Sequence, residues 1–182
     1  MNEYSDQELL EKFLDESTRH YAFNLLVIQY QQRLYWHVRR ILLDHEDSND
    51  VIQNVFIKVW NNLSTFRGDS HLYTWLYRIA TNEALTFLKQ KKRRFFISFN
   101  DVEYEMAGSL NSDPLFTGDK IEATLQQAIL KLPPQQRLVF NMKYFDAMKY
   151  EEISEILGVT VGALKASYHH AVKKISKYVT GS

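Results

Sequence analysis

Residues 149–178 carry two apolar stripes of helical spacing on either side of a glycine, and this stretch constrains the fold more than any other. In the first stripe, Ile153 and Leu157 recur at the i, i+4 spacing of one helix face. Gly158 follows at a position where helices commonly end in a left-handed residue. Thr160 is a suitable N-cap for the next helix. The pattern predicts a helix, a tight turn and a second helix.

The second predicted helix is basic on the face opposite its apolar stripe. Leu164, Ala171 and Ile175 belong to that stripe. Residues 160–182 contain four lysines and no carboxylate. Small, basic or imidazole side chains outside the stripe are the candidates for contact with a ligand: Lys165, Ala166, His169, His170 and Lys173.

Two interpretations of this helix stay open on these residues alone. Small residues early in a helix allow close approach to base edges in the DNA major groove, and lysines further along neutralise phosphates. The stretch would then be a DNA-binding helix-turn-helix. An ordinary helical hairpin with a solvated lysine face would have the same pattern.

The formal net charge of zero conceals an uneven distribution along the 182 residues. Residues 1–94 have 13 basic and 12 acidic side chains, and residues 95–122 have one basic and six acidic. Residues 123–182 have eight basic and four acidic side chains. A neutral and a basic lobe therefore flank an acidic middle, so the overall neutrality does not exclude a nucleic-acid partner.

Composition and motifs exclude several classes of protein. The chain has no cysteine, which rules out disulfides and thiolate metal sites. It shows no signal-peptide-like or membrane-spanning apolar run, so we expect a soluble cytoplasmic protein with no direct membrane insertion. Metalloprotease, P-loop and dinucleotide-binding motifs are missing from the sequence. We therefore predict no enzymatic activity, no catalytic residue, no metal and no cofactor.

The first 94 residues predict four helices and no strand. Ser5 and Glu8 have the spacing of a capping box at the start of the first helix. Each later segment has an apolar stripe that must be buried. The four predicted helices are residues 5–16, 23–41, 48–63 and 71–90.

The fourth of these helices has unusual aromatic content. Tyr73, Trp75 and Tyr77 occupy alternating positions, which at 100° per residue cannot all face the core. Arg78 lies beside them, and no carboxylate occurs between residues 70 and 82. Exposed aromatics next to an arginine can stack on unpaired bases. A core rich in aromatic residues explains the same pattern, and both interpretations stay open here.

The helical pattern disappears over residues 95–119, where glycine, serine, asparagine and proline are frequent. A structureless segment of this length is unusual inside one compact domain, so it is interpreted as a flexible acidic linker. Its aromatic residues indicate that it docks on another surface. The predicted fold is all-α, with one helical domain over 1–94 and a four-helix domain containing the helix-turn-helix over 120–182.

Several segments resemble regions 2 and 4 of the extracytoplasmic-function (ECF) sigma factors of the sigma-70 family. Residues 50–60 and 66–82 resemble region 2, and residues 132–137, 150–158 and 161–171 resemble region 4. The segments occur in the family's order with a linker between them. Two independent motifs in register are more specific than a lone helix-turn-helix.

The resemblance implies roles for two surfaces of the first domain. The helix around residue 54 would bind the β′ clamp helices of core RNA polymerase, through Asp50, Gln53, Asn54 and Lys58. The loop at 66–70 and the next helix would open the promoter −10 element and hold its non-template strand, with Asn82 helping to form a pocket for a flipped base. The residues implied for this role are Arg67, Asp69, Ser70, Tyr73, Trp75, Tyr77, Arg78 and Asn82.

The resemblance also implies partners for the rest of the chain. Region 4 would read the −35 element in the major groove and contact the polymerase β flap. The acidic linker would run through the polymerase towards the RNA path. An anti-sigma factor commonly holds such proteins inactive.

The recognition helix departs from the family pattern. The family favours Thr, Ser, Arg and Arg where this chain has Ala163, Ala166, Ser167 and His170. Fewer arginines provide fewer bidentate guanine contacts, which predicts weak intrinsic −35 affinity. Asn54 also replaces a frequent glutamate of the family, so the clamp contact is expected to differ.

Two alternatives to a promoter-specificity subunit follow from the same residues. One is a stand-alone helix-turn-helix regulator with an N-terminal regulatory domain. The other is a sigma-like adaptor that does not melt DNA. The carboxylate-free aromatic helix separates the first alternative from a sigma factor, since a duplex-binding regulator does not need it.

Overall fold

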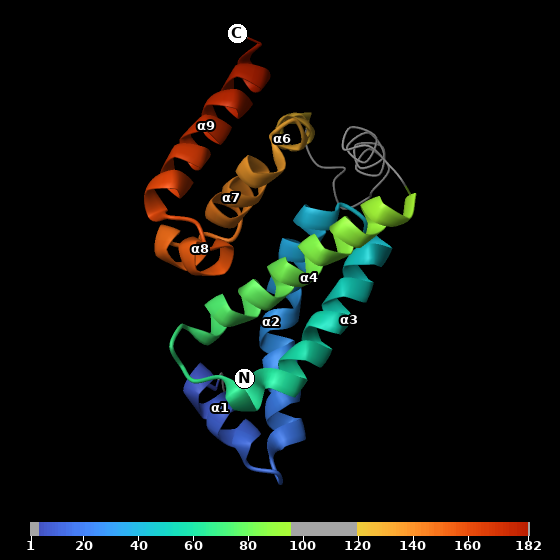
Figure 1. Cartoon of the computed structure of the whole chain (residues 1–182), viewed down its shortest axis with the longest axis vertical. Coiled ribbons are helices and arrows are strands. Elements are labelled where there is room, and N and C mark those ends of the chain that lie inside the picture. Colours follow the sequence, from blue (N-terminus) through green and yellow to red (C-terminus); the bar gives the residue numbers. More distant parts are fainter. Residues whose placement is uncertain (1–3, 96–119, 182) are drawn as a thin grey trace.

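The computed structural model describes residues 4–95 and 120–181, and the regular elements within these ranges are helices (Figure 1). The N-terminal helices are α1 (Asp6–Leu14), α2 (Arg19–Leu42), α3 (His45–Asn62), the short 3-10 turn η1 (Leu63–Thr65) and α4 (Leu72–Phe95). The C-terminal helices are α6 (Lys120–Leu130), α7 (Pro134–Tyr144), α8 (Tyr150–Leu157) and α9 (Val161–Thr180). The all-α prediction is confirmed.

Capping residues explain where several helices begin and end. The predicted capping box exists, since Ser5 N donates to Glu8 Oε2 at 2.8 Å and Glu8 N donates to Ser5 Oγ at 3.3 Å. The helix predicted over 48–63 begins earlier, at His45, because the Asp44 side chain accepts from Asp47 N at 2.8 Å. The helix predicted to stop at residue 90 continues to residue 95.

Helices α2, α3 and α4 each pack against the other two, and α1 packs against α2 (Figure 1). Leu34, Val55 and Leu76, one each from α2, α3 and α4, are completely buried. Burial of each such side chain stabilises the fold by about 1.5–3 kcal/mol. The ring of Trp60 lies 5.3 Å from that of Phe13, an edge contact that ties α3 to α1.

The C-terminal helices contain the predicted helix-turn-helix in α8 and α9. Gly158 ends α8 with a φ of +66°, a left-handed conformation that glycine adopts without strain. Thr160 then caps α9 by accepting a hydrogen bond from Ala163 N at 3.4 Å. Phe140 of α7 packs with Ala171 of α9 in the core of this group.

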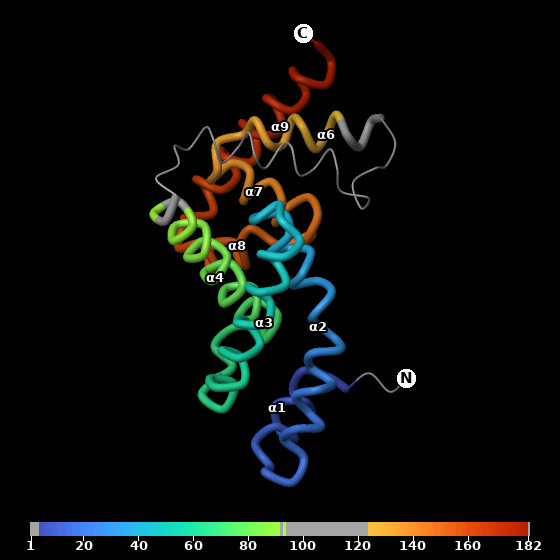
Figure 2. The backbone as a smooth tube through the Cα atoms, turned by 90° about the vertical axis from the view of Figure 1, so that its right-hand side faces the viewer, coloured from blue at the N-terminus to red at the C-terminus, as the bar shows by residue number. Residues whose placement is uncertain are grey.

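The two groups of helices contact each other directly. In both views α8 lies against α4, and residues of both groups belong to one hydrophobic cluster (Figures 1 and 2). Tyr77 and Ala80 of α4 share that cluster with Met148, Ile153 and Ile156 of the C-terminal group. The division into two domains stays a prediction, and the structure shows that the two groups of helices pack on one another.

Three further predictions concern the linker, membrane spans and metal sites. The predicted linker, 95–119, lies outside them except for Phe95, the last residue of α4. Within 4–95 and 120–181, no helix is long and apolar enough to cross a membrane. In the same residues no group of three or more His, Asp or Glu side chains is arranged to hold a metal ion.

Candidate nucleic-acid interface

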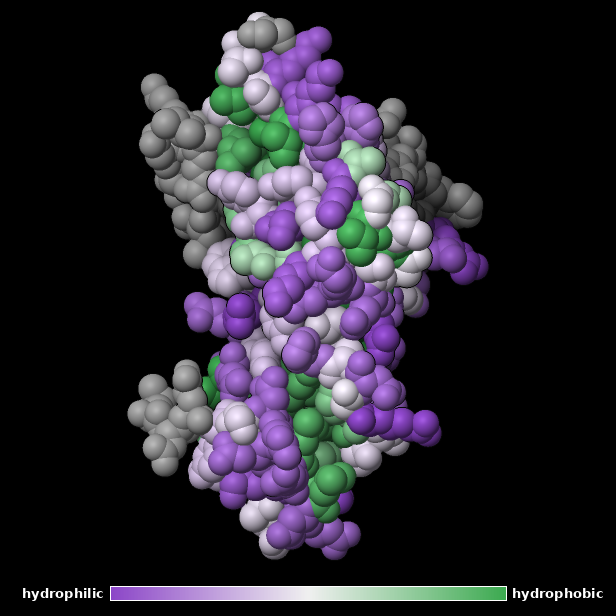
Figure 3. All heavy atoms as spheres, turned by 90° about the vertical axis from the view of Figure 1, so that its left-hand side faces the viewer, coloured by the Kyte–Doolittle hydropathy of each residue, from purple (hydrophilic) through white to green (hydrophobic). Residues whose placement is uncertain are grey.

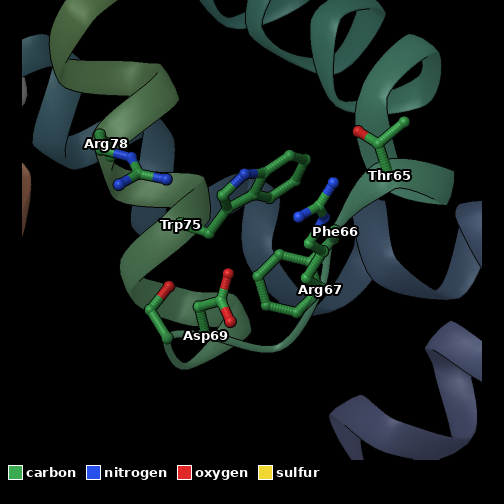
Figure 4. Close-up of a pocket in the computed structure, with 7 residues that line it drawn as sticks. Thr65, Phe66, Arg67, Asp69, Trp75 and Arg78 are labelled. Carbon is green, nitrogen blue, oxygen red and sulfur yellow. The ribbon is translucent and has the colours of Figure 1, made fainter.

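A surface hollow of about 160 Å³ lies where the loop after η1 turns into α4 (Figure 4). Gly68 has a φ of +75°, and this left-handed conformation lets the loop fold back towards the helix. Five of the residues named for the −10 element line the hollow, together with Phe66 of the predicted loop and Thr65, which was not predicted; the residues around it are Thr65, Phe66, Arg67, Asp69, Ser70, Trp75 and Arg78.

Trp75 forms the aromatic wall of this hollow. Leu72 and Leu76 of α4 are buried, which leaves Trp75 half-buried on the adjoining face of the helix. Its indole lies 5.3 Å from the ring of Phe66, centroid to centroid, at an interplanar angle of 53°. Phe66 therefore supports the tryptophan from the loop side.

Charged side chains surround this aromatic wall. Figure 4 shows Arg67 reaching in from the loop and Arg78 from α4, with Trp75 between them and Asp69 at the base of the hollow. Arg67, Asp69 and Arg78 are exposed. An aromatic face between two guanidinium groups suits a stacked base and its phosphates, while carboxylate and hydroxyl oxygens can accept hydrogen bonds from base edges.

Tyr73 and Tyr77 lie on a different face of α4, under α8. The Tyr77 side chain is buried, with its ring 4.5 Å from that of Tyr73 and 4.8 Å from the imidazole of His37. Tyr73 donates a hydrogen bond of 3.3 Å to the carbonyl oxygen of Asp146. Burial, with the Asp146 carboxylate next in importance, raises the pKa of Tyr73 to about 12 and raises that of Tyr77 as well. Neither tyrosine lines the hollow.

Asn82 occupies a third position on α4. It is exposed, one turn beyond Arg78, and does not line the hollow. Because residues four apart share a helix face, Arg78 and Asn82 continue the same exposed strip along α4. Of the predicted −10 residues, six therefore lie on or next to one surface, and Tyr73 and Tyr77 lie apart from them.

The predicted polymerase-binding residues share the outer face of α3. Asp50, Gln53, Asn54 and Lys58 are all exposed. Lys58 forms an ion pair with Glu83 of α4.

Ile57 is an apolar member of the α3 face that sequence reasoning missed. Its side chain is 58% exposed, next to the Lys58 position. The signal was present in the sequence, because residue 57 falls outside the buried positions at 51, 55 and 59. An apolar side chain surrounded by polar ones is a common composition for a protein-binding surface.

The predicted recognition residues of α9 all face solvent. Leu164, Ala171 and Ile175 are buried on the opposite side, as the apolar stripe predicted. On the side of the molecule shown in Figure 3, hydrophilic residues predominate and hydrophobic ones gather in separate patches. The exposed residues of α9 include Lys165, Ala166, His169, His170 and Lys173.

Comparison with known proteins places both groups of helices in one family. The model of Sigma-70 region 2 matches residues 26–94, and that of Sigma-70, region 4 matches residues 122–175. The RNA polymerase sigma-H factor of Pseudomonas aeruginosa is 32% identical, over 97% of this chain and 95% of its own length. The ECF RNA polymerase sigma-E factor of Escherichia coli K12 is 34% identical, over 96% and 94%. The chain belongs to the ECF sigma factors of the sigma-70 family.

Two solved structures share this sigma factor's fold. The sigma factor RpoE of Bartonella quintana, in complex with the anti-sigma factor NepR, superposes with a TM-score of 0.70 at 19% identity, covering 87% of this chain and 96% of that one. CnrH in complex with the cytosolic domain of CnrY gives a TM-score of 0.70 at 22% identity, covering 97% and 98%.

The family matches assign the surfaces of this sigma factor to its two regions. The hollow, the α3 face and the exposed strip of α4 all lie within residues 26–94, in region 2. The exposed face of α9 lies within residues 122–175, in region 4. The resemblance on residues 50–82 and 132–171 is confirmed as a family relationship.

Proposed function

We propose that this sigma factor binds core RNA polymerase through α3, holds the opened −10 strand in the hollow beside Trp75, and reads the −35 element with α9. The observation that carries the proposal is the hollow itself, where an aromatic wall lies between Arg67 and Arg78 at the surface of α4. Duplex DNA hides its base faces, so a site of this kind suits a protein that binds unstacked bases.

The −10 strand would lie along the exposed strip of α4. A base unstacked at the hollow would rest against Trp75, while Arg67 and Arg78 neutralise the phosphates on either side. Asn82 presents an amide one turn further along, where it can hydrogen-bond the edge of a neighbouring base. Stacking of this kind is worth about 1–3 kcal/mol per base, enough to offset much of the energy of unstacking.

The −35 element would be read by α9 in the major groove. Ala166 lies on its exposed face, where a small side chain permits close approach, and Lys165 and Lys173 flank it with positive charge. Lysines are point charges rather than bidentate readers of guanine. We therefore expect modest −35 affinity from region 4 alone, with core polymerase supplying the rest through its β flap.

The α3 surface would dock on the β′ clamp helices. Asp50, Gln53 and Asn54 supply hydrogen-bonding groups, and the exposed Ile57 supplies an apolar centre. The Lys58 ammonium, which pairs with Glu83, adds a cation at one side.

The remaining assignments follow from this role. Residues 1–94 and 120–182 would act as separate domains on the polymerase, joined by the linker over 95–119. An anti-sigma factor is a further proposed partner, by analogy with the RpoE–NepR pair. A protein with these partners would act in the cytoplasm and would itself catalyse no reaction.

The proposal is tested by run-off transcription with purified core polymerase and a promoter library. We expect the protein to bind core and to direct initiation from a subset of promoters. Binding to duplex DNA without core binding would instead identify a stand-alone regulator. Core binding without promoter opening would identify an adaptor.

A further inference from the structure

Asp146, in the loop between α7 and α8, reaches from region 4 into region 2. Its Oδ1 accepts a hydrogen bond from Nη1 of Arg40 at 2.9 Å. Its Oδ2 lies 2.9 Å from Nδ1 of His37. The Asp146 side chain is only 5% exposed, so these contacts replace the water that a carboxylate normally binds.

The side chains that bind this carboxylate all belong to region 2. His37 is fully buried in α2, and its Nε2 lies 2.8 Å from Oγ1 of Thr81 on α4. The Thr81 hydroxyl donates to the Tyr77 carbonyl at 2.7 Å, so it can only accept from the imidazole. Both ring nitrogens of His37 thus lie within hydrogen-bond distance of side-chain oxygens, one on Asp146 and one on Thr81.

The loop that carries Asp146 is also held in place. Asp146 N donates to the Asn141 carbonyl at 3.3 Å, and Met148 N donates to the Met142 carbonyl at 3.1 Å. Ala147, between them, has a φ of +53°, a left-handed conformation that is uncommon for a residue with a side chain. The carboxylate is therefore presented by a constrained turn.

This contact brings region 4 over one face of α4. With Asp146 in place, α8 packs on α4, and Tyr77 is buried in the cluster that contains Met148 and Ile153. Tyr73 is held by the Asp146 carbonyl. Both tyrosines are predicted contacts of the −10 strand, and region 4 covers them.

The surfaces that would meet polymerase and the unstacked base stay uncovered. Gln53, Asn54 and Lys58 are exposed in the same structure, as are Arg67 and Arg78. Core polymerase can therefore dock before the two regions separate. Only the Tyr73–Tyr77 face must lose its contact with region 4 before DNA can reach it.

We propose that Asp146 is an autoinhibitory latch, which closes region 4 onto the Tyr73–Tyr77 face of α4 by binding Arg40 and His37. The proposal rests on the function proposed above together with the sequence prediction that Tyr73 and Tyr77 contact the −10 strand, because inhibition has meaning only if that face serves the promoter. Removing one partner of a buried charge pair leaves the other without compensation. Loss of the Asp146 carboxylate therefore shifts the population towards the open form.

The experiment uses the full chain, whose lack of cysteine allows two labels to be placed at will. Spin labels on Gln32→Cys in α2 and Val172→Cys in α9, both exposed positions, report the distance between regions by pulsed electron resonance. The test variants are Asp146→Ala and the isosteric Asp146→Asn. Glu155→Ala, which removes an exposed carboxylate from α8, is the matched control.

We expect one narrow distance distribution for the unsubstituted chain and for Glu155→Ala. Asp146→Ala should broaden it and raise the ratio of open to closed molecules about tenfold or more. Asp146→Asn should give an intermediate ratio, since it keeps the shape of the side chain but not the charge. Circular dichroism checks that each variant is folded.

If both Asp146 variants give the same distribution of label-to-label distances as the unsubstituted chain, the proposed role of Asp146 as a latch is wrong. The proposed function is scored separately, by run-off transcription with the unsubstituted protein. If the Asp146 variants open but the protein directs no initiation, the latch stands and the proposed function fails. If initiation occurs and the distances do not change, the latch alone fails.

Discussion

Two faces of the same helix, α4, differ in what covers them. Trp75 and Arg78 face the hollow at the surface, whereas Tyr73 and Tyr77 lie beneath α8. Both pairs are aromatic or basic, so residue type alone does not separate them. This comparison shows that the amino-acid composition of α4 does not decide which aromatic side chains of α4 are accessible. The position of region 4 against α4 decides it.

The largest expected effect comes from the covered face. Tyr77→Ala removes a ring that is 1% exposed and packed against His37, and should lower the free energy of unfolding by about 3–5 kcal/mol. Urea denaturation followed by circular dichroism measures the change. Tyr77→Phe, which keeps the ring, is the control. A loss below about 1 kcal/mol for the alanine variant would mean that Tyr77 is not part of the core.

The open face should behave in the opposite way. Trp75→Ala should leave the fold and core binding intact but reduce promoter opening about ten- to hundredfold, the equivalent of one stacked base. Asn82→Ala should impair opening to a smaller degree. Run-off transcription and a core-binding assay separate the two effects, with Leu85→Ala as an exposed control on the same helix. Loss of core binding in both variants would make these residues structural.

A smaller effect is expected at the recognition helix. Lys165→Ala should weaken binding to a −35 duplex several-fold and reduce the salt dependence of binding by about one unit of slope. The measurement is a fluorescence-anisotropy titration of holoenzyme at several salt concentrations. Lys131→Ala, which removes the same charge outside α9, is the control. An unchanged salt slope would remove Lys165 from the phosphate contacts.

The smallest effect concerns pH and the covered face. The pKa of Tyr73 is raised to about 12 from its ordinary 10, mainly by burial. The folded protein keeps this proton where the unfolded chain has lost it, so the stability from the neutral hydroxyl is complete below pH 10 and is lost as pH rises towards 12. Tyr73→Phe should lose less stability than the unsubstituted protein across this window, as urea midpoints at each pH would show. Equal losses would contradict the assignment.

The local features of the fold could be predicted from the sequence because their causes are local. Ser5 with Glu8, Gly158 and Thr160 act on neighbouring backbone groups, and the structure has each in its predicted role. The exposed face of α9 likewise follows from a single periodic stripe.

The contact between regions could not be predicted, because its causes are not local. Asp146 lies in a short loop 109 positions from His37, and neither residue stands out in its own segment. The burial of Tyr77 could not be predicted either, since alternating aromatics look the same in sequence whether other helices cover them or not. The aromatic support from Phe66 was missed for a related reason, as it depends on how the loop folds back onto Trp75.

The central claim, that the open face of α4 holds an unstacked promoter base, is tested most directly by 2-aminopurine placed in the −10 non-template strand. Holoenzyme containing this sigma factor should raise the fluorescence of the label at the base that leaves the stack. Trp75→Ala should abolish most of that rise while core binding persists. No rise with the unsubstituted protein at any −10 position, despite core binding, would contradict the account.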